Sequence, residues 1–430
     1  MSGAKARLAA AELLVTILDE RRMLDEALVT SESYGRLTGP DRGFARAMAS
    51  AALRQLGRID MGLAPFLDRP LSSATPPARA LLRVGAAQSW LMETPDHAVV
   101  GETVAAAKIW PRARRGAGFL NAVLRKVVAD RSAFEAAPME AIWPQWLRAL
   151  FVDSVGKRAS LSLAEAQTKI PETYIIPRDG NVVGLAKRLG LSGQAIVAEH
   201  TVRSDTSAVD TLEGYEAGDW WVQDVAATLP ARLLDARPGE TVLDMCAAPG
   251  GKTMQLAATG AKVTAIDRSK PRLKRLRENL KRTGFDGDVD VQLADVSQWQ
   301  PPQPFDHILL DAPCSALGTL RRHPEGAWIK READLRHFPA MQARLLDSAL
   351  SMLKPGGTVI YCVCTPVTRE GEAVVAEALK THPRLSRVPI APFEVPGFET
   401  AVTRAGDLLT LPTSSFGHDH FYISRLTLWD

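Results

Sequence analysis

The stretch that decides the fold is TVLDMCAAPGGKT, residues 241–253. Its first part, residues 241–245, is apolar and partly β-branched, which is typical of a buried strand. Its second part contains two adjacent glycines, which let the backbone approach a ligand where a helix begins. The four-residue spacer between the glycines of a P-loop is missing, and so is the three-glycine dinucleotide fingerprint. The stretch therefore predicts a strand, a ligand-binding loop and a helix for a different class of ligand.

Four further apolar runs follow, and helical stretches separate them. The runs are Lys262 to Ile266, Val289 to Leu293, Phe305 to Leu310 and Thr358 to Val363. This alternation predicts an α/β fold over residues 216–430, with a doubly wound, mostly parallel, Rossmann-like sheet. A last run, Phe421 to Leu428, alternates between apolar and polar residues. We expect that run to form a strand that closes the sheet edge.

The N-terminal part of the chain has a different pattern. Residues 1–135 carry apolar side chains at helical spacing, and helix starts are indicated at Asp41, at Thr75 and at Asp96. Residues 136–215 contain several prolines and predict a mixed connecting subdomain without a clear topology. We therefore expect three parts, an all-α domain over 1–135, the connecting segment over 136–215 and the α/β domain over 216–430.

Composition narrows the class of protein. The 430 residues include only four cysteines, too few and too scattered for a disulfide framework. No run approaches the roughly 18 apolar residues of a membrane span, so we expect a cytoplasmic protein without a membrane partner. The net charge is only +3, but basic residues cluster over 112–131 and 268–282. Such clusters suit a polyanion, although each alone could be a solvated helix face.

Acidic residues stand at or just after the ends of successive predicted strands, at Asp267, Asp295 and Asp311. Ligands of doubly wound sheets bind at the carboxyl ends of the strands, where an acid commonly contacts a ribose hydroxyl. Together with the loop, these acids predict a nucleoside ligand with a non-phosphate tail, such as S-adenosylmethionine.

Two cysteines follow neighbouring predicted strands. Cys314 and Cys364 each come after a buried run, so a parallel sheet would place both thiols at its ligand-binding edge. A thiol pair there suggests covalent chemistry. For Cys246 and Cys362 we expect the usual role of free cysteine, a small buried hydrophobic side chain. Cys362 and Cys364 lack metal-ligand spacing and no Cys or His pair complements them, so we expect no metal site.

Longer motifs identify a family. The segments LDMCAAPGGKT (243–253), LDAPCSA (310–316) and RRHP (321–324), with Gly318, Tyr361 and Cys364, resemble the Sun-type RNA cytosine-5 methyltransferases. HAVVGETV (97–104) and GFLNAVLR (118–125) are similar to the NusB-like RNA-binding domain. This fusion of domains is similar to that of the members that act on small-subunit ribosomal RNA.

The resemblance implies a reaction and roles. It implies S-adenosylmethionine as cofactor, Cys364 as the nucleophile that adds to carbon 6 of cytosine, and Cys314 as the residue of product release. Asp311 would recognise the base and stabilise the adduct, and Lys252 would support the thiol. The implied cofactor residues are Asp244, Cys246, Ala247, Ala248, Pro249, Gly250, Gly251, Lys252, Asp267, Arg272, Asp295 and Asp311.

The implied partner is RNA, with no DNA, and the expected state is a monomer. The expected RNA contacts are Arg112, Arg114, Arg115, Arg125, Lys126, Arg321, Arg322 and His323. A transfer RNA or another ribosomal RNA as substrate, a non-catalytic assembly factor and a NusB-like transcription factor stay open as alternatives.

The chain also departs from the family pattern. Val363 replaces the usual threonine before the nucleophile. His418 and His420, which stand in place of a Gly-Phe-Phe-type segment, could lie on the surface or contact the substrate.

Overall fold

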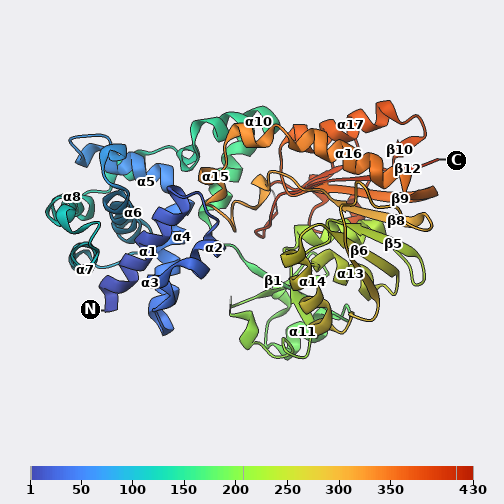
Figure 1. Ribbon diagram of the computed structural model, residues 1–430, viewed down its shortest axis with the longest axis horizontal. Helices are drawn as coiled ribbons and strands as arrows, with labels where there is room; N and C mark the ends of the chain where they lie inside the picture. The colour runs from blue at the N-terminus through green and yellow to red at the C-terminus, as the bar shows by residue number, and fades with distance from the viewer. Residues whose placement is uncertain (1, 207, 413, 430) are drawn as a thin grey trace. The chain divides into compact units, whose positions relative to one another are not determined.

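The computed structural model describes residues 2–206, 208–412 and 414–429, with the side chain of residue 2 excepted. The chain forms two compact units (Figure 1). The first unit comprises Met1–Lys169 and Leu320–Glu332, and the second comprises Ile170–Thr319 and Ala333–Asp430. The sequence-based division at 135 and 215 differs from these units, because residues 136–169 pack with the N-terminal helices and residues 320–332 return to them.

The first unit is helical, as the sequence predicted. The helix α1 contacts α4, α6 and α7 through buried side chains at helical spacing, among them Ala6, Ala10 and Leu13. Two predicted helix starts are confirmed, since α6 begins directly after Thr75 and α7 begins at Asp96. The helices are α1 (Ser2–Leu18), α2 (Leu24–Thr30), α3 (Glu32–Gly35), α4 (Gly39–Arg54), α5 (Leu56–Leu63), α6 (Pro76–Leu91), α7 (Asp96–Ile109), α8 (Ala117–Ala129), α9 (Ser132–Ala136), α10 (Gln145–Thr168) and α15 (Gly326–Ile329).

The second unit begins with a small antiparallel sheet. Its strand order is β2 (Ile196–Val197), β3 (Thr201–Ser204), β1 (Thr173–Pro177) and β4 (Trp220–Val222). The short helix α11 (Val182–Arg188) packs on it, and Ile175, Leu185 and Trp220 are buried between them. Part of the segment without a clear predicted topology is thus a subdomain of this unit.

The large sheet of the second unit positions the candidate site. Its order is β10 (Leu385–Arg387), β12 (Tyr422–Leu428), β9 (Leu353–Val363), β8 (Phe305–Asp311), β5 (Thr241–Met245), β6 (Lys262–Asp267) and β7 (Val289–Leu293), with β11 (Leu408–Leu409) paired to β12. The pairings from β9 to β7 are parallel. The predicted mostly parallel, doubly wound sheet is confirmed.

Helices cover both faces of this sheet (Figure 1). One face packs on α12 (Leu229–Leu234), α13 (Gly251–Ala258) and α14 (Lys270–Thr283), and the other on α16 (Phe338–Ser351) and α17 (Glu372–Thr381). Successive residues of β9 alternate between the two cores, with Ile360 and Cys362 on the first face and Tyr361 and Val363 on the second.

One expectation about the sheet is wrong. The last strand β12 does not close the edge, because it pairs antiparallel with β9 on one side and with β10 on the other. The short strand β10 takes the edge position. Within the described residues, no helix is long and apolar enough to cross a bilayer.

Candidate active site

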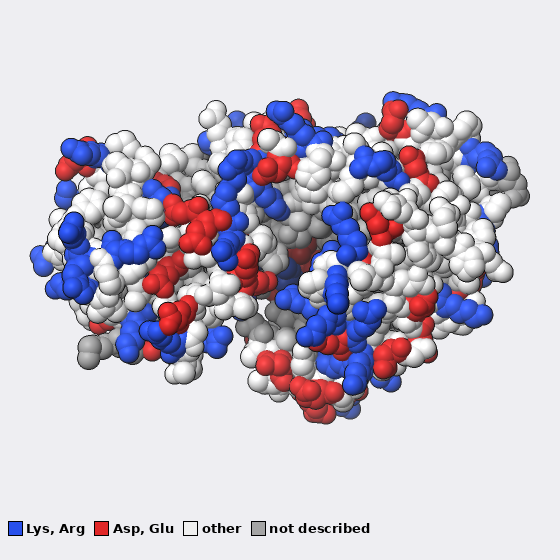
Figure 2. Space-filling model, in the orientation of Figure 1, with Lys and Arg blue, Asp and Glu red and all other residues white. Residues whose placement is uncertain are grey.

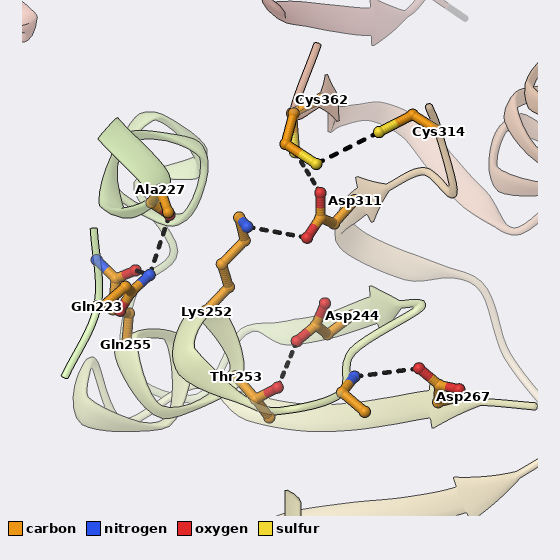
Figure 3. Close-up of polar contacts among 12 residues, drawn as sticks. Gln223, Ala227, Asp244, Lys252, Thr253, Gln255, Asp267, Asp311, Cys314 and Cys362 are labelled. Carbon is orange, nitrogen blue, oxygen red and sulfur yellow. Dashed lines mark hydrogen bonds and ion pairs between the residues drawn. The ribbon is translucent and has the colours of Figure 1, made fainter. Parts of the chain in front are cut away.

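Polar side chains of the neighbouring elements hold the loop between β5 and α13 in place (Figure 3). Thr253 Oγ1 donates to Asp244 Oδ2 at 2.6 Å. Asn279 Nδ2, on α14, donates to the Pro249 carbonyl at 2.9 Å. Gly250 has a φ of +104°, a left-handed conformation that strongly favours glycine. The predicted loop is therefore a fixed turn at the carboxyl end of β5.

A cavity of about 190 Å³ opens beside this loop. Four of the predicted cofactor residues line it, namely Cys246, Asp267, Arg272 and Asp295. Sequence reasoning did not identify the lining residues on α16, which are Met341, Arg344 and Leu345. Their helical spacing on an amphipathic helix is a signal of burial but not of a ligand.

Asp267 organises the polar side of the cavity. It accepts the backbone N–H groups of Ser269 at 2.8 Å and Ala248 at 3.3 Å, and Arg272 lies 3.3 Å from its Oδ2. Arg272 also donates to the Ala248 carbonyl. Asp267 is buried and thereby ties the end of β6 to the loop after β5.

Lys252 and Asp311 form the central ion pair of the site (Figure 3). Lys252 Nζ lies 2.9 Å from Asp311 Oδ2 and 5.2 Å from the centre of the Phe421 ring. Burial alone would lower the pKa of Lys252, but the facing Asp311 carboxylate more than offsets this effect and raises the pKa above its usual value. Lys252 is therefore a permanent ammonium beside Asp311.

The parallel pairing of β8 and β9 brings the two predicted cysteines together. Asp311 stands opposite Cys362, and Ala312 N donates to the Cys362 carbonyl at 2.9 Å, which extends the pairing beyond the strand. In the loops that follow, Cys314 Sγ lies 3.4 Å from Cys364 Sγ. The neighbouring Cys364 sulfur and burial raise the pKa of Cys314 well above its usual value, so Cys314 holds its proton.

The other two cysteines also hold their protons. Cys362 Sγ donates to Asp311 Oδ1 at 3.5 Å, and burial, with that carboxylate, raises the pKa of Cys362 well above its usual value. Burial and the Asp311 carboxylate raise the pKa of Cys246 to about 12. Val363, where the family usually has a hydroxyl, is fully buried in the core of the opposite face.

A polar network that sequence reasoning missed supports the Cys314 loop. Glu370 Oε2 accepts from Ser315 N at 2.8 Å and from Gln342 Nε2 at 3.3 Å, and Gln342 also donates to the Pro313 carbonyl at 3.0 Å. Tyr361 Oη donates to the Glu370 carbonyl at 2.6 Å. Because Glu370 and Gln342 are fully buried, each hydrogen bond here substitutes for hydration by solvent. Glu370 stands in the polar stretch TREGE, residues 368–372, so the sequence carried no signal of its burial.

The two C-terminal histidines are buried. His418 is 2% exposed and His420 is 4% exposed, so the surface interpretation is wrong. Backbone hydrogen bonds explain the position of His420, since His420 N donates to the Gly318 carbonyl and Gly318 N donates to the Cys364 carbonyl, both at 3.0 Å. This chain of bonds ties the segment after β11 to the cysteine loops.

The residues expected to contact RNA lie in different environments. The side chains of Arg112, Arg114, Arg115, Arg125 and Lys126 are exposed on the first unit. Arg321, in contrast, is 4% exposed, and its carbonyl accepts from Arg54 at 2.6 Å, so it has little surface to offer a nucleic acid. Arg322 and His323 are half-buried.

Two family models match the chain. The model described as 16S rRNA methyltransferase RsmB/F matches residues 231–427, and the NusB family matches residues 4–129. Ribosomal RNA small subunit methyltransferase B of Xanthomonas campestris pv. campestris is 36% identical over 88% of this chain and 88% of its own. The protein of the same name from Pseudomonas syringae pv. tomato is 32% identical over 98% of this chain and 96% of its own.

Solved structures share the fold. The crystal structure of PH0851 matches 99% of this chain and 98% of its own, with a TM-score of 0.76 and 23% identity. A methyltransferase homolog protein from Pyrococcus horikoshii matches 66% of this chain and 95% of its own, with a TM-score of 0.55 and 26% identity.

Gly318 is expected not to tolerate a side chain. A Cβ atom there would lie 2.0 Å from the His420 carbonyl oxygen and 2.8 Å from the Cys364 carbonyl oxygen, both backbone atoms. We expect Gly318→Ala to lower the free energy of unfolding by about 1–3 kcal/mol in urea denaturation. Gly287→Ala is the matched control, because nothing lies within 4 Å of its Cβ position. Equal stabilities of the two variants would contradict this close approach.

Asp244 is expected to make stability depend on pH. Burial raises the pKa of its carboxyl to about 7 from an ordinary 3.8. The folded protein then binds one more proton than the unfolded chain between these values, so this stabilisation is complete below about pH 3.8 and is lost as pH rises through about 7. Compared with Asp244→Asn, the wild-type free energy of unfolding should fall by about 1.4 kcal/mol per pH unit near pH 5 to 6, and by about half of that per unit at pH 7. Urea denaturation across that range measures it, and parallel curves for the two proteins would refute it.

Proposed function

Because the chain belongs to the 16S rRNA methyltransferase RsmB/F family, we propose that it transfers a methyl group from S-adenosylmethionine to carbon 5 of a cytosine in small-subunit ribosomal RNA. The observation that supports this reaction most directly is the 3.4 Å separation of the Cys314 and Cys364 sulfurs beside the Lys252–Asp311 ion pair. A folded domain that only bound RNA would have no need of such a pair.

The cavity beside the glycine loop fits the cofactor. Its acidic residues Asp267 and Asp295 suit hydroxyl and amine donors, and Ile266, Val296 and Leu345 offer apolar walls for a purine. Deeper in the site, Asp244 Oδ1 is buried and has no hydrogen-bond partner among the described residues, which leaves an acceptor for a ligand donor. When bound there, S-adenosylmethionine supplies an electrophilic methyl group on a sulfonium sulfur.

Cys364 has the role of nucleophile. Its thiol gives its proton to solvent and the thiolate adds to carbon 6 of the cytosine, so that the electrons of the carbon 5–carbon 6 double bond make carbon 5 nucleophilic. S-adenosylmethionine would supply the methyl group, whose bond to the sulfonium sulfur would break as the bond to carbon 5 forms. Asp311 lies beside this reaction, where it accepts from the exocyclic amine of the base and orients the ring. The Lys252 ammonium at 2.9 Å stabilises the negative charge on Asp311 and adds positive potential near the thiols.

Cys314 has the role of product release. After methylation the proton on carbon 5 must leave, and its bonding electrons re-form the double bond while the carbon 6–sulfur bond breaks. Cys314 gives its own proton to the departing Cys364 sulfur and takes the proton from carbon 5, so atoms and charge balance. Its raised pKa, caused first by the Cys364 sulfur and then by burial, suits a residue that holds a proton until that step.

Two further points complete the proposal. The protein works as a monomer in the cytoplasm, where ribosomal RNA is found and where thiols are kept reduced. The four cysteines, all of which are free in the structure, suit such a compartment.

Methyl transfer from labelled S-adenosylmethionine to small-subunit ribosomal RNA tests the proposal with single cysteine variants. Wild type should transfer methyl groups, Cys364→Ala should transfer none, and Cys314→Ala should accumulate a covalent protein–RNA adduct that migrates slowly in a denaturing gel. Cys362→Ala is the matched control, because its sulfur also contacts the site but has no covalent role in the mechanism. It should still transfer methyl groups without accumulating an adduct.

Other outcomes would redirect the proposal. Full activity of Cys364→Ala would exclude the covalent mechanism. Methylation of transfer RNA but not of 16S RNA, naked or in the ribosomal particle, would support the alternative substrate. A wild-type protein that binds the cofactor but methylates no RNA would support an assembly factor.

A further inference from the structure

The first unit contains a cavity that the methyl-transfer reaction does not use. It has a volume of about 670 Å³, within the range of small-molecule sites. Its walls come from the segment between α5 and α6 and from the segment between α7 and α8. All of its lining residues belong to the first unit.

Positive charge dominates the lining. Arg69, Arg112 and Arg115 line the cavity, and Asp68 is the only acidic residue among the described lining residues. The three arginines are exposed, and within the described part of the chain none of them makes an ion pair or a side-chain hydrogen bond. Guanidinium groups without a protein partner are suited to phosphate oxygens, which they bind in a bidentate manner.

Two helices begin at the same cavity. The residues that precede α6 and α8, Thr75 and Gly116, both line it, and the Thr75 side chain makes no capping bond. The N-terminal end of a helix carries partial positive charge, which stabilises a bound anion. The helix ends therefore add to the charge of the arginines.

An aromatic ring completes the cavity. Phe119 lines it and is 43% exposed, so part of its ring is open to a ligand in the cavity. An exposed ring beside arginines is the arrangement on which unpaired bases stack while their phosphates are bound. A phosphate ion alone would not need the ring.

The surface continues from the cavity along α8. Phe119, Ala122 and Lys126 are spaced by three and four residues, so they share one face of the helix, and all three are exposed. Arg125 is exposed next to them. Figure 2 shows Lys and Arg side chains gathered over α7 and α8. These residues form a basic track on α8 that offers a path for a nucleic-acid strand leaving the cavity.

We propose that this cavity binds an unpaired nucleotide of the RNA substrate, with the base stacked on Phe119 and the phosphates held by Arg69, Arg112 and Arg115. This inference rests on the proposed function in one respect, namely that the substrate is RNA. It adds a second RNA-binding site on a compact unit that contains no residue of the methyl-transfer chemistry. Because stacking needs an open face of the base, the site selects single-stranded over duplex RNA.

Binding of the full-length protein to a short labelled single-stranded RNA, and to a duplex of the same sequence, tests the proposal. Phe119→Ala should weaken binding to the single strand by roughly 5- to 150-fold, which corresponds to the loss of one stacked base. Phe119→Tyr should restore it. Phe393→Ala is the matched control, because Phe393 is an 83% exposed phenylalanine of the second unit. It should bind like the wild type.

The arginines are expected to change how the RNA affinity depends on salt concentration. Arg115→Ala should reduce the slope of log affinity against log salt concentration by about 0.7 for each phosphate that is no longer neutralised, whereas Phe119→Ala should leave the slope unchanged. Arg46→Ala, an exposed arginine of α4 outside the cavity, is the control and should change neither affinity nor slope. Circular dichroism should show that every variant is folded.

Several results would overturn the proposal. Wild-type affinity of both Phe119→Ala and Arg115→Ala for single-stranded RNA would exclude the site. Unchanged affinity for naked RNA with weakened binding to the ribosomal particle would indicate a protein partner instead. The binding assay does not depend on catalysis, so a wild type that methylates nothing while Phe119→Ala still weakens binding would refute the proposed function and leave this site standing. If the wild type methylates RNA and the cavity variants bind RNA like the wild type, the proposed function stands and this site is refuted.

Discussion

The parallel pairing of β8 with β9 is the constraint on which the active site depends. Asp311 and Cys362 are opposite each other at the end of this pairing, and backbone bonds from Ala312 N to the Cys362 carbonyl and from Gly318 N to the Cys364 carbonyl continue it into the loops. Without that register, two loops fifty residues apart in the chain would have no reason to place their sulfurs 3.4 Å apart. The buried network of Glu370 and Gln342 then holds one loop from behind.

The charged side chains of the site lie in the same small region. An isolated buried charge is costly, so each ionised group in this site has an opposite charge or several hydrogen bonds. Lys252 is paired with Asp311, and Asp267 is paired with Arg272 and two backbone N–H groups. Asp244 has no cation at hydrogen-bonding distance among the described residues, and its raised pKa reflects that burial. Asp267 and Arg272 line the cavity and are available to a nucleoside, whereas the Lys252–Asp311 pair lies beside the thiols.

The two compact units have different roles in the proposed reaction. The second unit contains the cavity beside the glycine loop and both cysteines of the proposed mechanism, and its helix α14 carries a second basic surface, visible in Figure 2. The first unit contains the arginine-lined cavity and the basic track on α8. The chain passes between the units at residues 169–170, 319–320 and 332–333, so the RRHP motif at 321–324 belongs to the helical unit although the catalytic motifs flank it. That membership explains the burial of Arg321, which had been expected on an RNA-facing surface.

Sequence by itself determined the helical and α/β classes of the two units, the bounds of β5 to β8 and β12 to within one residue, the glycine loop after β5 and the family, because hydrophobic period, glycine position and contiguous motifs are local properties. For example, β5 and β7 have the bounds that their apolar runs predicted. Only the tertiary structure decided the contacts between distant segments: the Lys252–Asp311 pair, the support of Cys314 by Glu370, the burial of His418 and His420, the inner position of β12 and the cavity around Phe119. These features depend on which surfaces pack together, and packing is set by the shape and polarity of many side chains at once, which no single stretch of sequence specifies.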